Sequence, residues 1–98
     1  MRRQQFLADR APDWEELDDL VERAGRRPER LGPDGVRRLG ALYRSAAADL
    51  ALARRAYPDD PVVPRLEALV GRARHLVYDA RPRRGSLRRF LTPATARQ

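Results

Sequence analysis

The expected fold is organised around the segment Val36–Tyr57, which has the sequence VRRLGALYRSAAADLALARRAY. Its apolar residues follow one another in alternating steps of three and four: Val36, Leu39, Tyr43, Ala46, Leu50, Ala53 and Tyr57. This period places them on one face of an α-helix. At about 1.5 Å per residue the helix would be about 33 Å long. We therefore expect it to be the central helix of the fold.

A second apolar seam follows after a short break. The break is Pro58-Asp59-Asp60-Pro61, in which Asp60 is a good N-cap and Pro61 suits a first helical position. The seam beyond it has the same spacing: Val63, Leu66, Val70, Ala73, Val77 and Ala80. We expect a helix from about Val62 to Ala80. Because the connection is short, this helix should run antiparallel to the central one.

The first third of the chain predicts two further helices. Trp14, Leu17, Leu20, Val21 and Ala24 form a one-sided stripe, so a helix is expected from about Asp13 to Ala24, with Pro12 in its first turn. A short helix around Arg3–Asp9 precedes it, and Gly32-Pro33-Asp34-Gly35 is expected to be a loop.

The expected fold class is therefore all-α, a small antiparallel bundle of about four helices over residues 1–80, followed by a basic tail over residues 81–98. The expected core consists of Trp14, Leu17, Leu39, Tyr43, Leu50, Leu66, Val70 and Val77.

Composition argues against most kinds of reaction chemistry. The chain has 98 residues, no cysteine and one histidine, His75. These counts exclude thiolate catalysis, zinc sites built on sulfur and centres with several histidines. Gly32-Pro33-Asp34-Gly35 does not fit a phosphate-binding loop. We expect a protein that is not an enzyme and has no catalytic residue, metal or cofactor.

The basic residues are unevenly distributed. The chain has 21 arginines and no lysine against 14 acids, and six of the arginines lie in residues 81–98, where there is no acid. The remaining residues are nearly neutral, so the excess charge belongs to the tail. Its expected contacts with anionic lipid or nucleic acid are Arg81, Arg83, Arg84, Arg88 and Arg89.

The tail also carries apolar residues at helical spacing, namely Leu87, Phe90 and Leu91. Arginines interleaved with such residues are typical of a segment that lies in a lipid interface. A reader of nucleic-acid bases would need more aromatic side chains than Phe90 alone. A solvated run that only keeps the protein soluble is the third interpretation.

Asp49 is the one acid inside the apolar central stretch, and Arg44 lies five residues before it. We expect these two side chains to hydrogen-bond at the edge of the seam. The alternative is a polar contact between Asp49 and a partner helix.

Three phrases of the chain resemble a known family. They are FLADRAPDW at Phe6–Trp14, LYRSAAADLALAR at Leu42–Arg54 and LEALVGRARHLVY at Leu66–Tyr78. Together they resemble the N-terminal region of the stage II sporulation protein M family of bacterial membrane proteins. The resemblance implies a cytosolic helical domain that precedes a multi-span membrane domain. In spore formers this family takes part in peptidoglycan remodelling during engulfment.

The membrane spans of that family are missing here, so the chain is expected to be either the excised domain of a longer protein or a stand-alone homologue. The favoured function is a non-catalytic interaction module at the cytoplasmic face of the membrane, with the tail at the membrane-proximal end and a protein partner that the sequence does not identify. The alternatives are a small nucleic-acid-binding protein that uses the tail and a self-associating helical scaffold. The sequence leaves the oligomeric state open.

Overall fold

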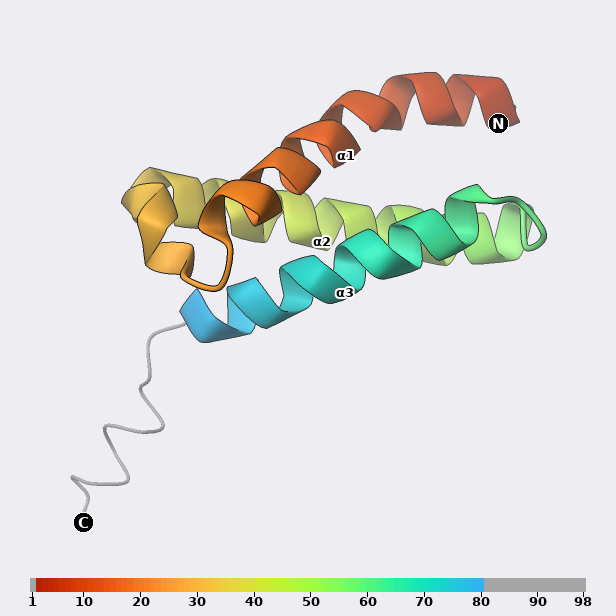
Figure 1. The fold of residues 1–98 in the computed structure, drawn as a ribbon. Coiled ribbons are helices and arrows are strands. Elements are labelled where there is room, and N and C mark those ends of the chain that lie inside the picture. The colour runs from red at the N-terminus through yellow and green to blue at the C-terminus, as the bar shows by residue number, and fades with distance from the viewer. Residues whose placement is uncertain (1, 81–98) are drawn as a thin grey trace, which may run out of the picture.

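The structure is a computed structural model that describes residues 2–80, and all its regular elements there are helices. In order they are α1 (Arg3–Ala24), the 3₁₀ helix η1 (Pro28–Leu31), α2 (Gly32–Ala56) and α3 (Val62–Ala80). The chain folds back after α2, so that α3 lies along α2, and α1 packs against both (Figure 1). The all-helical prediction is confirmed for this part of the chain.

The predicted break before Asp13 is wrong, because α1 is one helix of 22 residues with Pro12 in its interior. A proline there removes one backbone hydrogen bond. Packing compensates on both sides of Pro12: Phe6 and Trp14 are buried, and their rings contact each other along α1 with centroids 5.6 Å apart. Phe6 also packs on Tyr57 at the far end of α2, with centroids 5.9 Å apart. Both halves of α1 are thus held against the same surface.

The segment expected to be a loop at Gly32–Gly35 is instead the first turn of α2, with Pro33 among its first two residues. A proline costs nothing there, since the first N–H groups of a helix have no partner within the helix. The connection between α1 and α2 is therefore shorter than expected, and it contains η1. Gly25 ends α1 with a φ of 60° and Gly32 follows η1 with a φ of 74°, values in the left-handed region that favours glycine.

The bounds predicted for the last helix are confirmed, since α3 covers Val62–Ala80. Asp60 caps its start, because the carboxylate accepts a hydrogen bond from the backbone N–H of Val62 at 2.8 Å. The same carboxylate pairs with Arg3, which fastens the beginning of α1 to this turn. Both contacts lower the pKa of Asp60, the Arg3 hydrogen bond more strongly.

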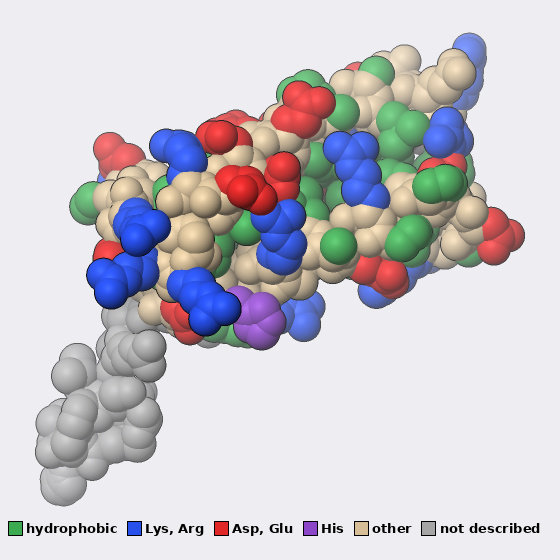
Figure 2. All heavy atoms as spheres, viewed as in Figure 1, with side chains coloured by type: hydrophobic (Ala, Val, Ile, Leu, Met, Phe, Trp, Pro, Cys, Tyr) green, Lys and Arg blue, Asp and Glu red, His purple; other side chains and the backbone are tan. Residues whose placement is uncertain are grey.

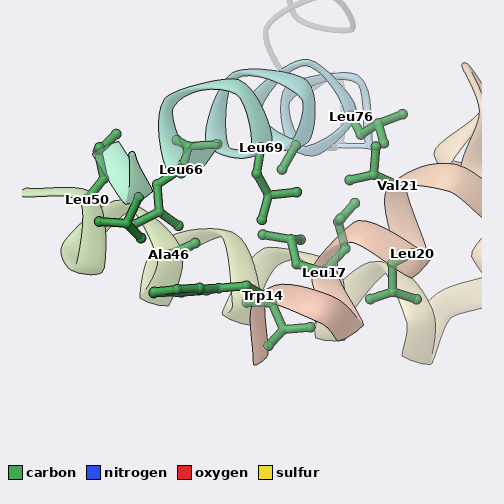
Figure 3. Close-up of a cluster of buried hydrophobic side chains, with 14 of the residues drawn as sticks. Trp14, Leu17, Leu20, Val21, Ala46, Leu50, Leu66, Leu69 and Leu76 are labelled. Atoms are coloured by element: carbon green, nitrogen blue, oxygen red, sulfur yellow. The ribbon is translucent and has the colours of Figure 1, made fainter. Parts of the chain in front are cut away.

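The core receives side chains from all three α-helices, and Figure 3 shows them meeting in one interior cluster. Trp14, Leu17, Leu39 and Leu66 are almost completely buried. Of the predicted core, Leu50 and Val70 are buried as well, whereas Tyr43 and Val77 are half-buried at its edge. Small residues of the central seam, Ala46 and Ala53, are buried where helices pack closely.

Candidate functional site

The residues predicted to make contact with lipid or nucleic acid lie outside the described residues. They are Arg81, Arg83, Arg84, Arg88 and Arg89, together with the apolar Leu87, Phe90 and Leu91. Their role stays a prediction. The structure does describe the place from which this segment starts, because it follows directly on Ala80 at the end of α3.

The end of α3 lies beside the turn that joins α1 to α2 (Figure 1). An open groove of about 420 Å³ separates the last turn of α3 from the last turn of α1. Its lining residues are Val21, Glu22, Gly25, Arg26, Arg72, His75, Leu76 and Asp79. The groove has apolar side chains in its lining, and its charged residues are two arginines and two acids. Its formal charge is therefore balanced.

The turn itself is strongly basic. Residues 23–30, RAGRRPER, contain four arginines and one glutamate. Arg23 pairs with Asp19 at 3.0 Å within α1. In the part of the chain that the structure describes, Arg26, Arg27 and Arg30 have no carboxylate within ion-pair distance. Their side chains are exposed, and none of the three forms an ion pair within residues 2–80.

The backbone holds these arginines together. The N–H of Arg27 donates to the carbonyl of Ala24 at 2.8 Å, and the N–H of Arg30 donates to the carbonyl of Arg27 at 3.0 Å. The guanidinium of Arg30 folds over Gly25, with one nitrogen 3.5 Å from where a Cβ would stand. Arg26 faces the groove toward α3. We call the set Arg26, Arg27 and Arg30 the basic turn.

Several other arginines form ion pairs with acids of a neighbouring helix. The guanidinium of Arg38 on α2 donates two hydrogen bonds to the carboxylate of Glu16 on α1, both 2.7 Å long. The Arg38 guanidinium lowers the pKa of Glu16. Arg72 of α3 donates to Asp18 at 3.0 Å and to Glu22 at 2.9 Å, both on α1. The acidic face of α1 is thus used partly to hold the neighbouring helices.

Two further contacts connect α2 to α3. Arg54 of α2 donates to Glu67 of α3 at 2.9 Å. Arg74 of α3 donates to the hydroxyl of Tyr43 on α2 at 3.3 Å, and this contact raises the pKa of Arg74. The side chains of Arg54 and Glu67 are both largely exposed, so their ion pair contributes little to stability.

Asp49 has a different partner from the one preferred on sequence grounds. Its carboxylate accepts hydrogen bonds from Arg10 Nε at 2.9 Å and from the indole N–H of Trp14 at 2.8 Å, both on α1. Arg10 also donates to Ser45 at 2.9 Å. The hydrogen bond to Asp49 is the main cause that raises the pKa of Arg10. Asp49 therefore joins α2 to α1, and no contact with Arg44 is formed.

His75 is exposed at the rim of the groove. Among residues 2–80 the structure contains no group of three or more His, Cys, Asp or Glu side chains arranged to hold a metal ion. Within the same residues no helix is both long enough and apolar enough to span a membrane.

The net charge of residues 1–80 does not indicate the basic turn. Over residues 1–80 the arginines nearly balance the acids, and this sum conceals a local excess. The signal that could have found it is the short run RAGRRPER, which contains Glu29 as its only acid. Its position next to the origin of the tail is a property of the tertiary structure alone.

Comparison with known proteins gives one family. No curated protein matches the chain, and no solved structure matches it. The resemblance to the stage II sporulation protein M family stays a prediction. The model of a family described as "Domain of unknown function (DUF8413)" matches residues 4–79, which cover α1, η1, α2 and nearly all of α3. The chain therefore belongs to the DUF8413 family.

Proposed function

We propose that this protein is a non-catalytic interaction module, an antiparallel helical bundle whose arginine-rich segment 81–98 contacts an anionic membrane surface. The observation that carries the proposal is the distribution of charge. Residues 81–98 contain six arginines and no acid, whereas residues 1–80 contain 15 arginines and 14 acids. Basic segments of this kind bind anionic leaflets with about 1 kcal/mol for each arginine near the surface.

The contacts of the body support a structural role for its charged residues. Arg38–Glu16, Arg54–Glu67 and the Arg72 pairs each connect two helices. The carboxylates of these pairs help to hold the helices of the bundle together. The body then acts as a folded platform, and the tail supplies the electrostatic attachment.

The proposal takes the membrane-proximal position of the tail from the resemblance to the stage II sporulation protein M family. An arginine cluster next to a membrane obeys the positive-inside bias when it lies on the cytoplasmic side. In this arrangement the bundle projects into the cytoplasm and is available to a protein partner.

Co-sedimentation of the full chain with vesicles tests the proposal. Vesicles of phosphatidylglycerol and phosphatidylcholine are compared with vesicles of phosphatidylcholine alone, at fixed salt. The tail variant R84Q/R88Q/R89Q should bind the anionic vesicles on the order of 100-fold more weakly than the wild type. A matched control is R2Q/R44Q/R55Q, which removes the same charge from exposed arginines that have no carboxylate partner among the described residues.

Three results would overturn the proposal. The first is that the wild type does not bind the anionic vesicles. The second is that the tail variant binds as well as the control. The third is that duplex DNA at the same salt removes the protein from the vesicles completely, which would favour the nucleic-acid alternative. Far-UV circular dichroism of each variant checks that the helices are intact.

A further inference from the structure

The folded body has a basic end of its own, which is formed by the basic turn and lies beside the end of α3. Figure 2, in the orientation of Figure 1, shows arginine side chains gathered at the end of the body where η1 lies. Arg26, Arg27 and Arg30 belong to this end, and all three are exposed. Fifty residues separate the basic turn at Arg30 from the last residue of α3, Ala80.

The two basic segments are brought together by the way the helices turn. Gly25 and η1 turn the chain at one end of the body, and α3 returns to that same end. Arg26 of the turn and Asp79 of α3 line the same groove, so the turn and the end of α3 lie close together. Residue 81 follows α3 directly, so the arginine-rich segment begins beside the basic turn. The basic turn and the end of α3 thus lie at one pole of the described body.

We propose that the basic turn itself contacts the headgroups of an anionic lipid bilayer, so that the body stands on its η1 end. This inference rests on the proposed function, in which the tail binds the same surface. It adds that the folded body also contacts the bilayer and does so in one orientation. The end of the bundle formed by the α2–α3 connection then points away from the bilayer.

The charge of the turn favours this orientation over the others. A carboxylate near a guanidinium would cancel its attraction for lipid phosphate, and none lies within ion-pair distance of these three arginines in residues 2–80. The acids of α1 from Asp13 onward occupy its second half, and the last of them, Glu22, pairs with Arg72 beside the groove. A body lying on its side along that acidic face would be repelled, whereas at the turn the three arginines outnumber the two nearby acids, Glu29 and Asp79.

An exposed aromatic residue favours lipid over nucleic acid. Tyr78 lies in the last turn of α3 and is 54 % exposed. Among residues 2–80 it is the one large hydrophobic side chain that is exposed. Tyrosine is enriched at the headgroup level of membranes, where its ring and its hydroxyl are both accommodated. The stacking of bases needs several exposed rings, but Phe6 and Trp14 are buried in the core.

The test uses the full chain and phosphatidylglycerol-containing vesicles. The turn variant R26Q/R27Q/R30Q is compared with R2Q/R44Q/R55Q, which removes three charges elsewhere. Each arginine near an anionic leaflet strengthens binding about fivefold, so the turn variant should bind on the order of 100-fold more weakly than the wild type. The control should change binding little, because α2 alone is about 37 Å long and charge is screened over about 8 Å at physiological salt.

The outcomes separate the two proposals. If the tail variant loses binding but the turn variant binds like the control, the end-on orientation is wrong and the proposed function stands. If the wild type does not bind, both fail. The variant Y78S should weaken vesicle binding several-fold and leave any DNA binding unchanged, whereas Y78F should retain vesicle binding because it keeps the ring. Equal vesicle binding by Y78S and the wild type would contradict the interfacial role of this tyrosine.

Discussion

Replacement of Asp49 by alanine should be the most damaging single change to a charged residue in this body. The carboxylate of Asp49 lies between α1 and α2 with its side chain 13 % exposed, and Trp14, which donates to it, is 1 % exposed. In D49A the indole N–H would be left buried without an acceptor. A buried donor without a partner costs about 1–3 kcal/mol.

Loss of the Arg10 contact adds to this cost. Arg10 is 27 % exposed and still reaches Asp13 at 3.0 Å and Ser45, so the guanidinium is neither fully desolvated nor left alone. We therefore assign this contact about 1 kcal/mol. The expected loss for D49A is about 3 kcal/mol in the free energy of unfolding. A domain of this size has roughly 4–12 kcal/mol in total, so the melting temperature should fall by on the order of 15 °C.

Urea denaturation followed by far-UV circular dichroism measures this difference. D49N keeps an oxygen acceptor and should lose less than D49A. E16Q is the matched control, because it removes the inter-helix pair with Arg38, whose side chains are 50 % and 42 % exposed. Because both side chains are in contact with solvent, that variant should lose little stability, clearly less than D49A. In a W14F background the indole N–H is absent, so the loss caused by D49A should shrink by about 1–2 kcal/mol.

The reasoning would be refuted if D49A lost no more stability than E16Q. It would also be refuted if the W14F background left the effect of D49A unchanged, because the hydrogen bond from the indole would then contribute nothing.

Two other predictions concern glycines and acid. Gly71→Ala in α3 should raise the free energy of unfolding by about 0.5–1 kcal/mol, because a Cβ there meets nothing within 4 Å and alanine loses less backbone entropy on folding. Gly35→Ala should lower it, because its Cβ would stand 2.7 Å from Cβ of Leu31, and equal shifts in the urea midpoint of the two variants would contradict this comparison. Stability should also fall in acid, because Arg38 holds the pKa of Glu16 below its ordinary 4.5 and Arg3 holds the pKa of Asp60 below its ordinary 3.8. A carboxyl whose pKa is lowered by folding stabilises the fold above its ordinary pKa and loses that contribution as the pH falls through the folded value. Thermal unfolding should therefore change little between about pH 7 and pH 5 and drop below about pH 4, less steeply in E16Q/D60N, and an identical drop in that variant would exclude these two groups as a cause.

The sequence predicted the helical periods well, because an amphipathic helix records its buried face in its own spacing. The bounds of α3 follow from Asp60 and the prolines around it, and the seam from Leu39 to Ala53 is buried as its spacing indicates. The N-terminal region was divided wrongly because Pro12 is a local signal for a helix start. That signal is overridden by burial of Phe6 and Trp14 on either side of it. No local rule includes this contact energy.

The partners of the charged residues could not be predicted from the sequence. Arg44 is the near neighbour of Asp49 in the chain, yet Arg10, 39 residues away, is the one that binds it. The reason is that an α-helix directs residues five apart to different sides, while packing brings distant helices within hydrogen-bond distance.

What the sequence alone determined is the helical class, the core-facing seams and the neutral body with a basic tail, since each of these is a property of residue type and spacing. Three features follow from tertiary packing: α1 is one helix, Asp49 connects α2 to α1, and the basic turn lies beside the end of α3. Those three facts depend on how helices turn and pack, because contacts between residues far apart in the chain contribute free energies that no local pattern contains.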